Sequence, residues 1–524
     1  MNKASRLRIR VLQNLRVALR RCCCALLGLA LALQVQAQVT LPDLGGRSEV
    51  MPPEQARSFP REFRNYMRAQ GVLVEDPLIE EYISDMGYRL VMHSDGRDQP
   101  FHFFVLNIPE INAFAAPAGV IAMYSGLILA ARSQDEVAGV LAHEVSHVTQ
   151  NHLARGLEQT QQVSMPLLLA TFGLVLAGSM AGKLDGDVAA GVLSSGVGLA
   201  QQAQINYTRQ NEAEADRIGI QLLARAGYDP NGMASFFETL NQRLRALGSG
   251  PPEYLRSHPM TVNRLAEARE RAEKLVVREK QGDERFGFIQ ARLRVLGAAH
   301  PDEAADWFTR RLSVEPEDAW RYGLALADLR RGRFESAEAR IRELERNRAD
   351  DQLIRLLEAE LRLAQGQWSD ALALYQSLYR DYGASRPIVL AYAEALLHEA
   401  DASNAGKAAA MLRELLIRDP EDLRANELLA LAAARSGDAV RAAEAQAMVY
   451  YQQDRLSEAV DQLRQALKRP ELGYYDRSRL QARLDQWRVE LLRTRRRGDD
   501  DPERNLRPAA TPDAGGIRTG VTAW

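Results

Sequence analysis

The chain has 524 residues, and at roughly 150 residues per domain this length predicts at least two domains rather than one compact core. Its 67 basic and 69 acidic residues leave a formal net charge of -2, so the charge balance indicates no nucleic-acid partner. The cysteines are Cys22, Cys23 and Cys24, all in one N-terminal apolar segment, which excludes disulfides, thiol catalysis and cysteine-bound zinc from the rest of the chain.

The N-terminus has the form of a secretory signal peptide. Basic residues without any acid precede an apolar run from Cys22 to Leu33, which is shorter than the roughly 20 residues that a bilayer-spanning helix needs. Val35-Gln36-Ala37 supplies the small residues that a signal peptidase reads. We therefore predict a signal peptide over residues 1–37, cleavage after Ala37 and a periplasmic location. The alternative is an uncleaved N-terminal anchor.

The first part of the mature chain predicts an arm and then a helix. Residues 38–61 are rich in proline, glycine and polar residues, which is typical of a flexible arm, and we expect order to begin near Glu62. Residues 76–93 place apolar side chains at helical spacing, and Asp76 with Pro77 forms a good N-cap and first helical position.

Strand patterns follow this helix. Phe101–Leu106 is rich in aromatic and β-branched residues. Ala113–Ala116 and Val120–Tyr124 lie on either side of Pro117-Ala118-Gly119, which has the composition of a tight turn. The sequence therefore predicts a small β-sheet that contains a hairpin over residues 113–124.

The strongest chemical signal is the motif His143-Glu144-Val145-Ser146-His147, on a helix that Ser133 and Glu136 begin with a capping box. Two histidines four residues apart lie on one face of a helix and can bind one metal ion, while Glu144 faces a water on that ion. Since the chain has only 8 histidines, a chance match to this motif is improbable. The alternative is a helix whose histidines make ordinary polar contacts.

Zinc would need a third protein ligand. The metzincin spacing asks for a histidine six positions after His147, but that residue is Leu153. His152 lies five positions after His147, about 500° further round the helix, so we expect it to point well away from the ligand face. We interpret it as a surface residue or as one that supports a ligand from outside.

A second acidic helix offers the missing ligand. Glu212 and Asp216 are four residues apart on one helical face, so Glu212 would bind zinc and Asp216 would accept the free N–H of a liganding histidine. Glu214 points roughly 200° away from Glu212 and is predicted to be a solvated charge. From spacing alone, an ordinary exposed acidic face remains the alternative.

Residues 165–182 contain no charge and come close to the length of a membrane span. Glycines dilute this run, and a similar small-residue stretch at Val188–Ala200 favours two helices that fold on each other as a mobile hairpin beside the site. The alternative is a segment that dips into a membrane or touches its surface.

The C-terminal part of the chain shows a repeat. Gly332-Arg-Phe-Glu-Ser-Ala recurs as Gly366-Gln-Trp-Ser-Asp-Ala at an offset of 34 residues, which is the tetratricopeptide period. We therefore predict a linker over residues 276–300 and four to five helical repeats over residues 301–494, with an irregular helical bundle as the alternative. Residues 495–524 are polar and rich in proline and glycine, which predicts a disordered tail.

These motifs together resemble a known family. The HExxH motif and the later Glu-Ala-Glu-Ala-Asp run are similar to the HExxH…ExxAD pattern of the gluzincin-like metallopeptidases, which include the CAAX prenyl proteases and the membrane protease HtpX. Asn112–Gly119, Ser257–Arg264 and the repeats resemble, beyond that pattern, the periplasmic β-barrel assembly-enhancing proteases. One departure is Ala118, where the family pattern usually has a second glycine, so the turn next to the substrate-binding edge strand is expected to be stiffer.

The predicted fold class is α+β. Residues 62–275 would form a mainly helical gluzincin-like metallopeptidase domain with a small β-sheet, followed by an all-α tetratricopeptide solenoid. The resemblance implies one zinc ion per chain, bound by the ligands His143, His147 and Glu212, with Glu144 as the general base and Asp216 behind the ligands.

The resemblance also implies a regulatory or transition-state role for His258, with Arg264 nearby. Two opposite interpretations of His258 follow. It either occupies the fourth zinc position and keeps the enzyme latent, or it swings out and stabilises the oxyanion of the reaction. From the sequence alone, a lone histidine before a proline is as readily an ordinary loop residue.

The resulting hypothesis is a periplasmic zinc endopeptidase in the quality control and assembly of outer-membrane β-barrel proteins. An extended peptide could add to the edge of the hairpin over residues 113–124, which suits unfolded chains as substrates. The resemblance implies two partners: misassembled outer-membrane proteins and, through the repeats, the machinery that inserts them. The first alternative is a chaperone or assembly scaffold with latent or minor proteolysis, which would have no reason to keep the HExxH motif and Glu212. A weaker alternative is a membrane-embedded protease that uses residues 165–182 as a span.

Overall fold

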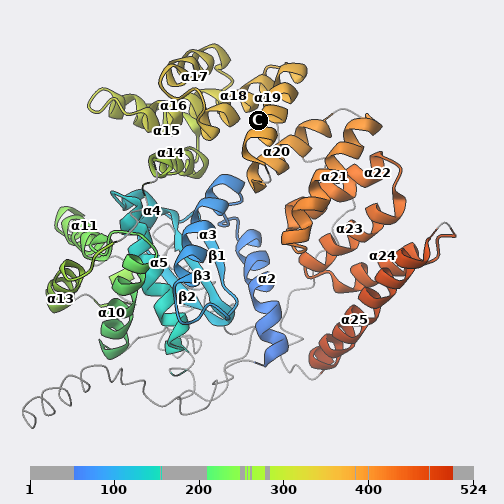
Figure 1. Cartoon of the computed structure of the whole chain (residues 1–524), viewed down its shortest axis with the longest axis horizontal. Helices are drawn as coiled ribbons and strands as arrows, with labels where there is room; N and C mark the ends of the chain where they lie inside the picture. The colour runs from blue at the N-terminus through green and yellow to red at the C-terminus, as the bar shows by residue number, and fades with distance from the viewer. Residues whose placement is uncertain are drawn as a thin grey trace, which may run out of the picture. The chain divides into compact units, whose positions relative to one another are not determined.

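The computed structural model describes residues 52–499 except for short gaps and one long one, and the described residues belong to one compact unit (Figure 1). The gaps are at residues 154, 156–208, 248–253, 256–257, 260–261, 278–281, 283, 384, 399–400 and 471. The predicted signal peptide, the hairpin over residues 165–200 and most of the predicted tail lie outside the described residues. Within the described ranges, no helix is both long and apolar enough to cross a membrane.

Helix α2 (Pro53–Ala69) corrects the predicted arm, because residues 53–61 are helical rather than flexible. Proline is compatible with the first turn of a helix, so the proline content that indicated an arm here marks a helix start. Phe59, Phe63 and Met67 recur every four residues and are buried in one apolar cluster with strand residues of the sheet. This helix therefore covers one face of the sheet.

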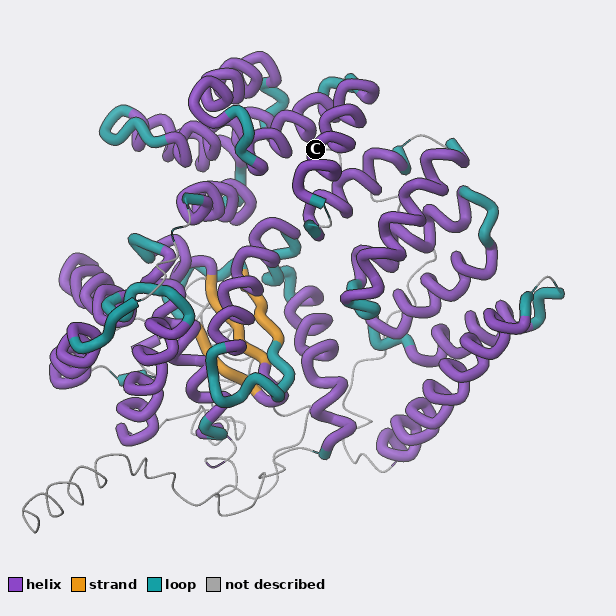
Figure 2. The backbone as a smooth tube through the Cα atoms, viewed as in Figure 1, coloured by secondary structure: helices purple, strands orange, loops and turns teal. Residues whose placement is uncertain are grey.

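The sheet has three strands, β1 (His102–Leu106), β2 (Ala113–Ala116) and β3 (Val120–Tyr124), in the order β1-β3-β2; they are labelled in Figure 1 and orange in Figure 2. Strand β1 runs parallel to β3, and β2 runs antiparallel to it with Phe114 opposite Ala122, which confirms the predicted hairpin. Strand β2 therefore lies at one edge of the sheet.

The hairpin turn has two residues in the left-handed region, Ala118 with φ 57° and Gly119 with φ 72°. A Cβ atom at Gly119 would lie 1.9 Å from the carbonyl oxygen of Pro100, so only glycine fits there. Ala118 adopts a conformation that costs an ordinary residue about 1 kcal/mol. The turn is thus strained at the position where the sequence departs from the family pattern.

Helix α5 (Gln134–Thr149) lies between β2, α3 (Pro77–Met92), α10 (Arg209–Arg225) and α11 (Gly232–Leu247), as Figure 1 shows. The Ser133 side chain accepts a hydrogen bond from the backbone N–H of Glu136, so the predicted cap begins α5. A Cβ atom at Gly219 of α10 would come within 3.2 Å of the backbone of Ala142 in α5. The glycine lets the two helices approach closely, which brings the first turn of α10 to the histidine face of α5.

The C-terminal part is a series of paired helices, which confirms the predicted all-α repeat region (Figures 1 and 2). Several of the turns between these helices have the same backbone conformation. Gly332, Gly366 and Gly437 each have a positive φ just after a helix end, and Asp454 has one at the following turn. The helices are α14 (Arg285–Gly297), α15 (Pro301–Leu312), α16 (Asp318–Arg330), α17 (Phe334–Arg348), α18 (Gln352–Ala364), α19 (Trp368–Tyr382), α20 (Arg386–Leu396), α21 (Ala402–Arg418), α22 (Leu423–Arg435), α23 (Ala439–Gln452), α24 (Leu456–Leu467) and α25 (Tyr474–Asp499).

Helix α14 corrects the predicted linker over residues 276–300. Residues 285–297 are helical, and their apolar side chains, among them Phe286, Phe288 and Ile289, are buried. The helix packs against α3, α4 (Ser125–Ala130) and α16, so it joins the N-terminal region to the repeats instead of separating them. The sequence did not indicate this helix, because its apolar residues lie on all sides and do not form the single stripe that marks an amphipathic helix.

A buried cluster of charged and polar side chains lies where α14 meets the N-terminal region and the repeats. Arg292 of α14 donates to both carboxylate oxygens of Asp76, at 2.9 and 3.0 Å, and to the hydroxyl of Tyr322 at 3.2 Å. It also reaches Glu360 of α18 at 3.3 Å. We call Arg292, Asp76, Tyr322 and Glu360 the junction cluster. It places one guanidinium between two carboxylates from elements far apart in the sequence.

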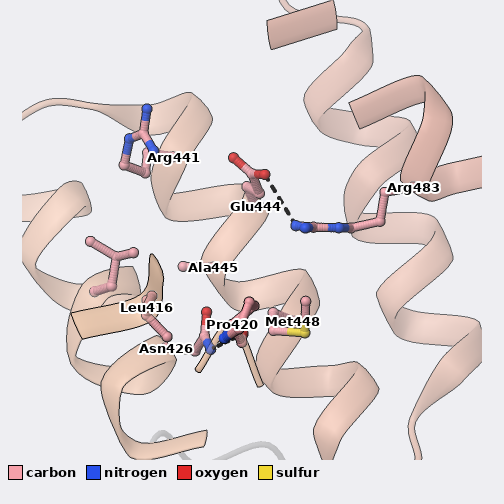
Figure 3. A pocket seen from close by; sticks show the side chains of 9 residues that line it. Leu416, Pro420, Asn426, Arg441, Glu444, Ala445, Met448 and Arg483 are labelled. Carbon is pink, nitrogen blue, oxygen red and sulfur yellow. Dashed lines mark hydrogen bonds and ion pairs between the residues drawn. The ribbon is translucent and has the colours of Figure 1, made fainter. Parts of the chain in front are cut away.

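The repeats also contain a pocket of about 130 Å³ between the end of α21, α22, α23 and α25 (Figure 3). Leu416, Leu429 and Met448 supply its apolar lining. Glu444 in the pocket accepts a hydrogen bond from Arg483 at 3.1 Å, and it also pairs with Arg479 outside the lining. The charge of Glu444 is therefore neutralised within the repeats.

Candidate metal centre

Four side chains from three parts of the chain converge in the N-terminal region. Helix α5 supplies His143 and His147 one turn apart, the first turn of α10 supplies Glu212, and His258 comes from the segment before α13 (Val262–Glu273). One ligand atom from each lies within 4.8 Å of the others, and each residue is about 1% exposed. We call these four residues the ligand cluster. The structure thus brings together all three predicted metal ligands and adds His258 to them.

The distances inside the ligand cluster are short. The Nε2 atoms of His143 and His147 are 2.9 Å apart, and each lies 3.4 to 3.5 Å from a carboxylate oxygen of Glu212. The Nδ1 atom of His258 lies 2.9 Å from Oε1 of Glu212 and 3.2 Å from Nε2 of His143. Polar atoms of four buried side chains therefore face one common point.

The outer nitrogens of the two α5 histidines show that this arrangement fits a metal ion. The Nδ1 atom of His143 lies 3.0 Å from Asp216, and the Nδ1 atom of His147 lies 2.8 Å from Nδ1 of His152. If each Nδ1 carries the ring hydrogen for its outer partner, both Nε2 atoms direct lone pairs at the centre. A metal ion at the centre would accept both lone pairs, whose nitrogens are only 2.9 Å apart. Histidine nitrogens and one carboxylate are the donor set that divalent transition metals, zinc above all, prefer.

The charges of the side chains in the ligand cluster also favour a cation at its centre. Burial alone would raise the pKa of Glu212, but His258, His143 and His147 hold that pKa far below its ordinary value, so the group is a carboxylate. Burial would lower the pKa of His143, but the neighbouring carboxylates of Asp216 and Glu212 raise it to about 10. His147 has its pKa lowered by burial and by His143. The surrounding carboxylates therefore require positive charge at the centre.

Asp216 lies behind His143, in the place where the sequence predicted a carboxylate for a liganding histidine. The structure adds Arg264, which binds both oxygens of Asp216 at 2.7 and 2.8 Å and lies 2.8 Å from Glu212. Arg264 also donates to the backbone carbonyl of Pro259 at 2.9 Å. One guanidinium thus fixes the ligand Glu212 and the carboxylate behind His143. Sequence reasoning placed Arg264 only near the site, because no spacing rule connects α13 to α10.

His152 contradicts the predicted direction but agrees with one of its two interpretations, a residue that supports a ligand from outside. It is 1% exposed and contacts His147, whereas a continuous helix would point it well away. Helix α5 ends at Thr149, and Asn151 has a φ of 53°, so the chain turns back before His152. The Nε2 atom of His152 lies 3.1 Å from Glu214, which is half-buried and paired rather than a solvated charge.

Glu144 is fully buried beside the ligand cluster. Burial raises its pKa above the ordinary value, while the charges of His258 and His143 lower it. The Nε2 atom of His258 lies 3.5 Å from Oε1 of Glu144. A carboxyl group whose pKa is shifted upward by burial is suited to exchange a proton near neutral pH.

The backbone and an aromatic ring hold His258 in place. The ring of Tyr254 stacks on His258 with centroids 4.8 Å apart, and the N–H of His258 donates to the carbonyl of Tyr254 at 2.8 Å. The N–H of Tyr254 donates to the carbonyl of Ile111, just before β2, at 3.2 Å. His258 therefore lies in the geometry of the first interpretation, among the ligand atoms. No motif or spacing in the sequence indicated a role for Tyr254.

Comparison with known proteins places this geometry in a family context. Residues 77–272 match the model of peptidase family M48. The chain is 32% identical to the "Beta-barrel assembly-enhancing protease" of Escherichia coli (strain K12) over 439 residues, which covers 83% of this chain and 88% of that protein. It is 30% identical to a "Putative beta-barrel assembly-enhancing protease" of Vibrio cholerae over 83% of this chain and 89% of that protein. It is also 27% identical, over 38% of this chain and 56% of the relative, to the "Mitochondrial metalloendopeptidase OMA1" of Schizosaccharomyces pombe.

Proposed function

Because this chain belongs to the beta-barrel assembly-enhancing proteases of peptidase family M48, we propose that it is a periplasmic zinc endopeptidase that degrades misfolded or stalled outer-membrane β-barrel proteins. Membership makes the chain a metallopeptidase with a metal-binding ligand cluster. The observation that carries the proposal is the convergence of His143, His147 and Glu212 on one point, with Glu144 buried next to it.

In the proposed mechanism His143, His147 and Glu212 hold zinc, and Asp216 orients His143. A zinc ion bound there supplies Lewis-acid activation of a water and of the scissile carbonyl. Glu144 accepts the proton of the attacking water and returns it to the leaving amine. The buried environment that raises the pKa of Glu144 supports both transfers, because the carboxyl must be able to hold the proton between them.

We further propose that His258 is a latch. Its ring occupies the space between Glu212 and Glu144, 2.9 Å from the first and 3.5 Å from the second. A peptide carbonyl and a water need that space, so His258 must leave before the reaction begins. The stacking of Tyr254 on His258 supports a closed state in which proteolysis is latent.

The edge strand β2 supports binding of extended peptides. The N–H of Tyr124 donates to the carbonyl of Asn112 at 3.0 Å, so by the alternation of an antiparallel pair the backbone groups of Ala113 and Ala115 face away from β3. A peptide that pairs with this edge is recognised by its backbone and passes beside Glu144. Such recognition tolerates many sequences, which suits unfolded outer-membrane proteins.

The names of the relatives and the repeat region support the proposed partners. Helical repeats form extended surfaces that bind other proteins, so we propose that residues 301–494 recruit the β-barrel assembly machinery or its clients to the metallopeptidase region at residues 62–275. Membrane contact through residues 165–182 stays a prediction. A chaperone or assembly scaffold with latent proteolysis is the second candidate, and the closed position of His258 favours it.

The test is cleavage of an unfolded β-barrel protein by the purified chain beside Glu144→Gln, with zinc measured on both. We expect the variant to keep one zinc per chain and to lose cleavage by a factor on the order of 10³, because the general base is gone. Cleavage by the variant at the wild-type rate would contradict the role of Glu144. Stoichiometric zinc without any cleavage by the wild type would favour the scaffold.

A further inference from the structure

The two histidines of the HExxH motif are supported differently from outside. His143 meets a carboxylate directly, through Nδ1 and Asp216 at 3.0 Å. His147 meets a second histidine instead, because its Nδ1 lies 2.8 Å from Nδ1 of His152. The other nitrogen of His152 lies 3.1 Å from Oε2 of Glu214. A carboxylate therefore stands behind each ligand, but behind His147 it acts through an intervening imidazole.

The hydrogen positions in this chain of contacts follow from its two ends. With zinc bound at Nε2 of His147, as in the proposed function, the ring hydrogen belongs on Nδ1. His152 must then accept at Nδ1 and carry its own hydrogen on Nε2, which it donates to the carboxylate of Glu214. Each contact thus has one donor and one acceptor, with His147 and His152 both neutral.

The local backbone is built to make this contact. Asn151 reverses the chain at the end of α5 with a φ of 53°, a conformation that asparagine tolerates better than most residues. The reversal places the His152 ring beside His147 with 1% of the residue exposed. Glu214 is one-third exposed, and Arg217 lies 4.0 Å from it. The imidazole of His152 therefore spans the distance from a buried ligand to a carboxylate near the surface.

We propose that His152 is a positioning residue that connects His147 to Glu214 and fixes the tautomer and ring orientation of His147 for metal binding. The proposal rests on the proposed role of His147 as a zinc ligand. Partners that hold the outer nitrogen of a liganding histidine typically change metal affinity by 10- to 100-fold when they are removed. A residue that only filled space beside α5 would not have this effect.

The test measures zinc affinity of the full chain by competition with a chromophoric chelator, together with the visible absorption spectrum of the cobalt-substituted protein. We expect His152→Leu to weaken zinc binding by roughly 10- to 100-fold and to shift the cobalt spectrum. His152→Gln should recover most of the affinity, because its amide can accept from His147 and donate to Glu214. Glu214→Gln, near the surface, should weaken binding several-fold, and the exposed control His93→Ala should change nothing.

The outcomes separate this proposal from the proposed function. If the wild type binds no stoichiometric zinc, both are overturned. If the wild type binds zinc and cleaves, but His152→Leu matches it in affinity and cobalt spectrum, only the role of His152 is overturned. Equal losses in the Leu and Gln variants, with Glu214→Gln unchanged, would show that the imidazole matters for packing alone, and would also overturn the proposal.

Discussion

The ligand cluster and the junction cluster are both buried groups of ionisable side chains, and they differ in what stands at the centre. In the junction cluster the guanidinium of Arg292 lies between Asp76 and Glu360, so the chain supplies its own cation. In the ligand cluster, histidine nitrogens and a carboxylate face a common point, and Arg264 binds the carboxylates from outside. The junction cluster thus contains its own cation, whereas the ligand cluster presents nitrogen and oxygen donors that suit a metal ion.

Removal of the metal should affect the ligand cluster and leave the junction cluster unchanged, which is the largest difference expected between them. We expect a strong chelator to abolish cleavage and added zinc to restore it. Zinc at a hundredfold its Kd should also raise the free energy of unfolding by about 2.7 kcal/mol. The Arg292→Met variant should show the same zinc-dependent increment in urea unfolding, because the two clusters share no residue. A smaller increment in that variant would mean that the clusters are coupled.

Substitution of Arg292 tests the junction cluster, because it removes the cation that this cluster contains. Arg292→Met leaves Asp76 and Glu360 buried without a countercharge, and we expect it to lower the free energy of unfolding by about 3–5 kcal/mol in urea titrations. Zinc content per folded chain should not change. As a control, Arg311→Met removes a surface ion pair with Glu315 and should cost less than about 1 kcal/mol. Equal effects of the two substitutions would contradict the role of the junction cluster.

If His258 is the proposed latch, its position determines whether substrate can reach the ligand cluster. If the latched state outweighs the open state by ten to one, His258→Ala should raise kcat/KM for an unfolded substrate by about tenfold. The measurement is a cleavage rate at matched zinc loading, since His258 also contacts Glu212. A fall in kcat/KM with zinc retained would support the other interpretation, in which His258 stabilises the oxyanion.

The smallest effect concerns Glu360 and pH. Burial raises the pKa of Glu360 above its ordinary 4.5 despite the charge of Arg292. The folded state therefore binds this proton more tightly, so the contribution of Glu360 is fully present below pH 4.5 and is lost as the pH rises through the raised pKa. We expect Glu360→Gln to change stability by less than about 1 kcal/mol at pH 7, because Gln still accepts from Arg292. The advantage of the wild type over Glu360→Gln should shrink from pH 4.5 upward, and a growing advantage in urea unfolding would contradict the assignment.

The sequence predicted those parts of the site that follow helical periodicity. His143, His147, Glu212 and Asp216 each lie four residues from a partner, and the structure brings all four together. The predicted direction of His152 was wrong because the angle assumed that α5 continues past Thr149. Asn151 was the available signal, since asparagine often ends a helix in the left-handed conformation.

The remaining differences have physical causes as well. Contacts between distant segments leave no periodic pattern, so the pairing of Arg292 with Asp76, 216 residues away, could not be read from spacing. The predicted arm over residues 38–61 overlaps the start of α2, because a proline-rich composition indicates an arm although proline also fits a first helical turn. The hairpin over residues 113–124 was predicted correctly because its turn composition is local.

The most direct test of the metal centre is anomalous X-ray diffraction at the zinc absorption edge, from crystals of the full chain grown with zinc. The account predicts a single strong peak among His143 Nε2, His147 Nε2 and the carboxylate of Glu212, and no peak at Arg292. A protein that cleaves unfolded substrates but shows no peak within the ligand cluster, or shows its peak elsewhere, would contradict the assignment of this cluster as the catalytic metal centre.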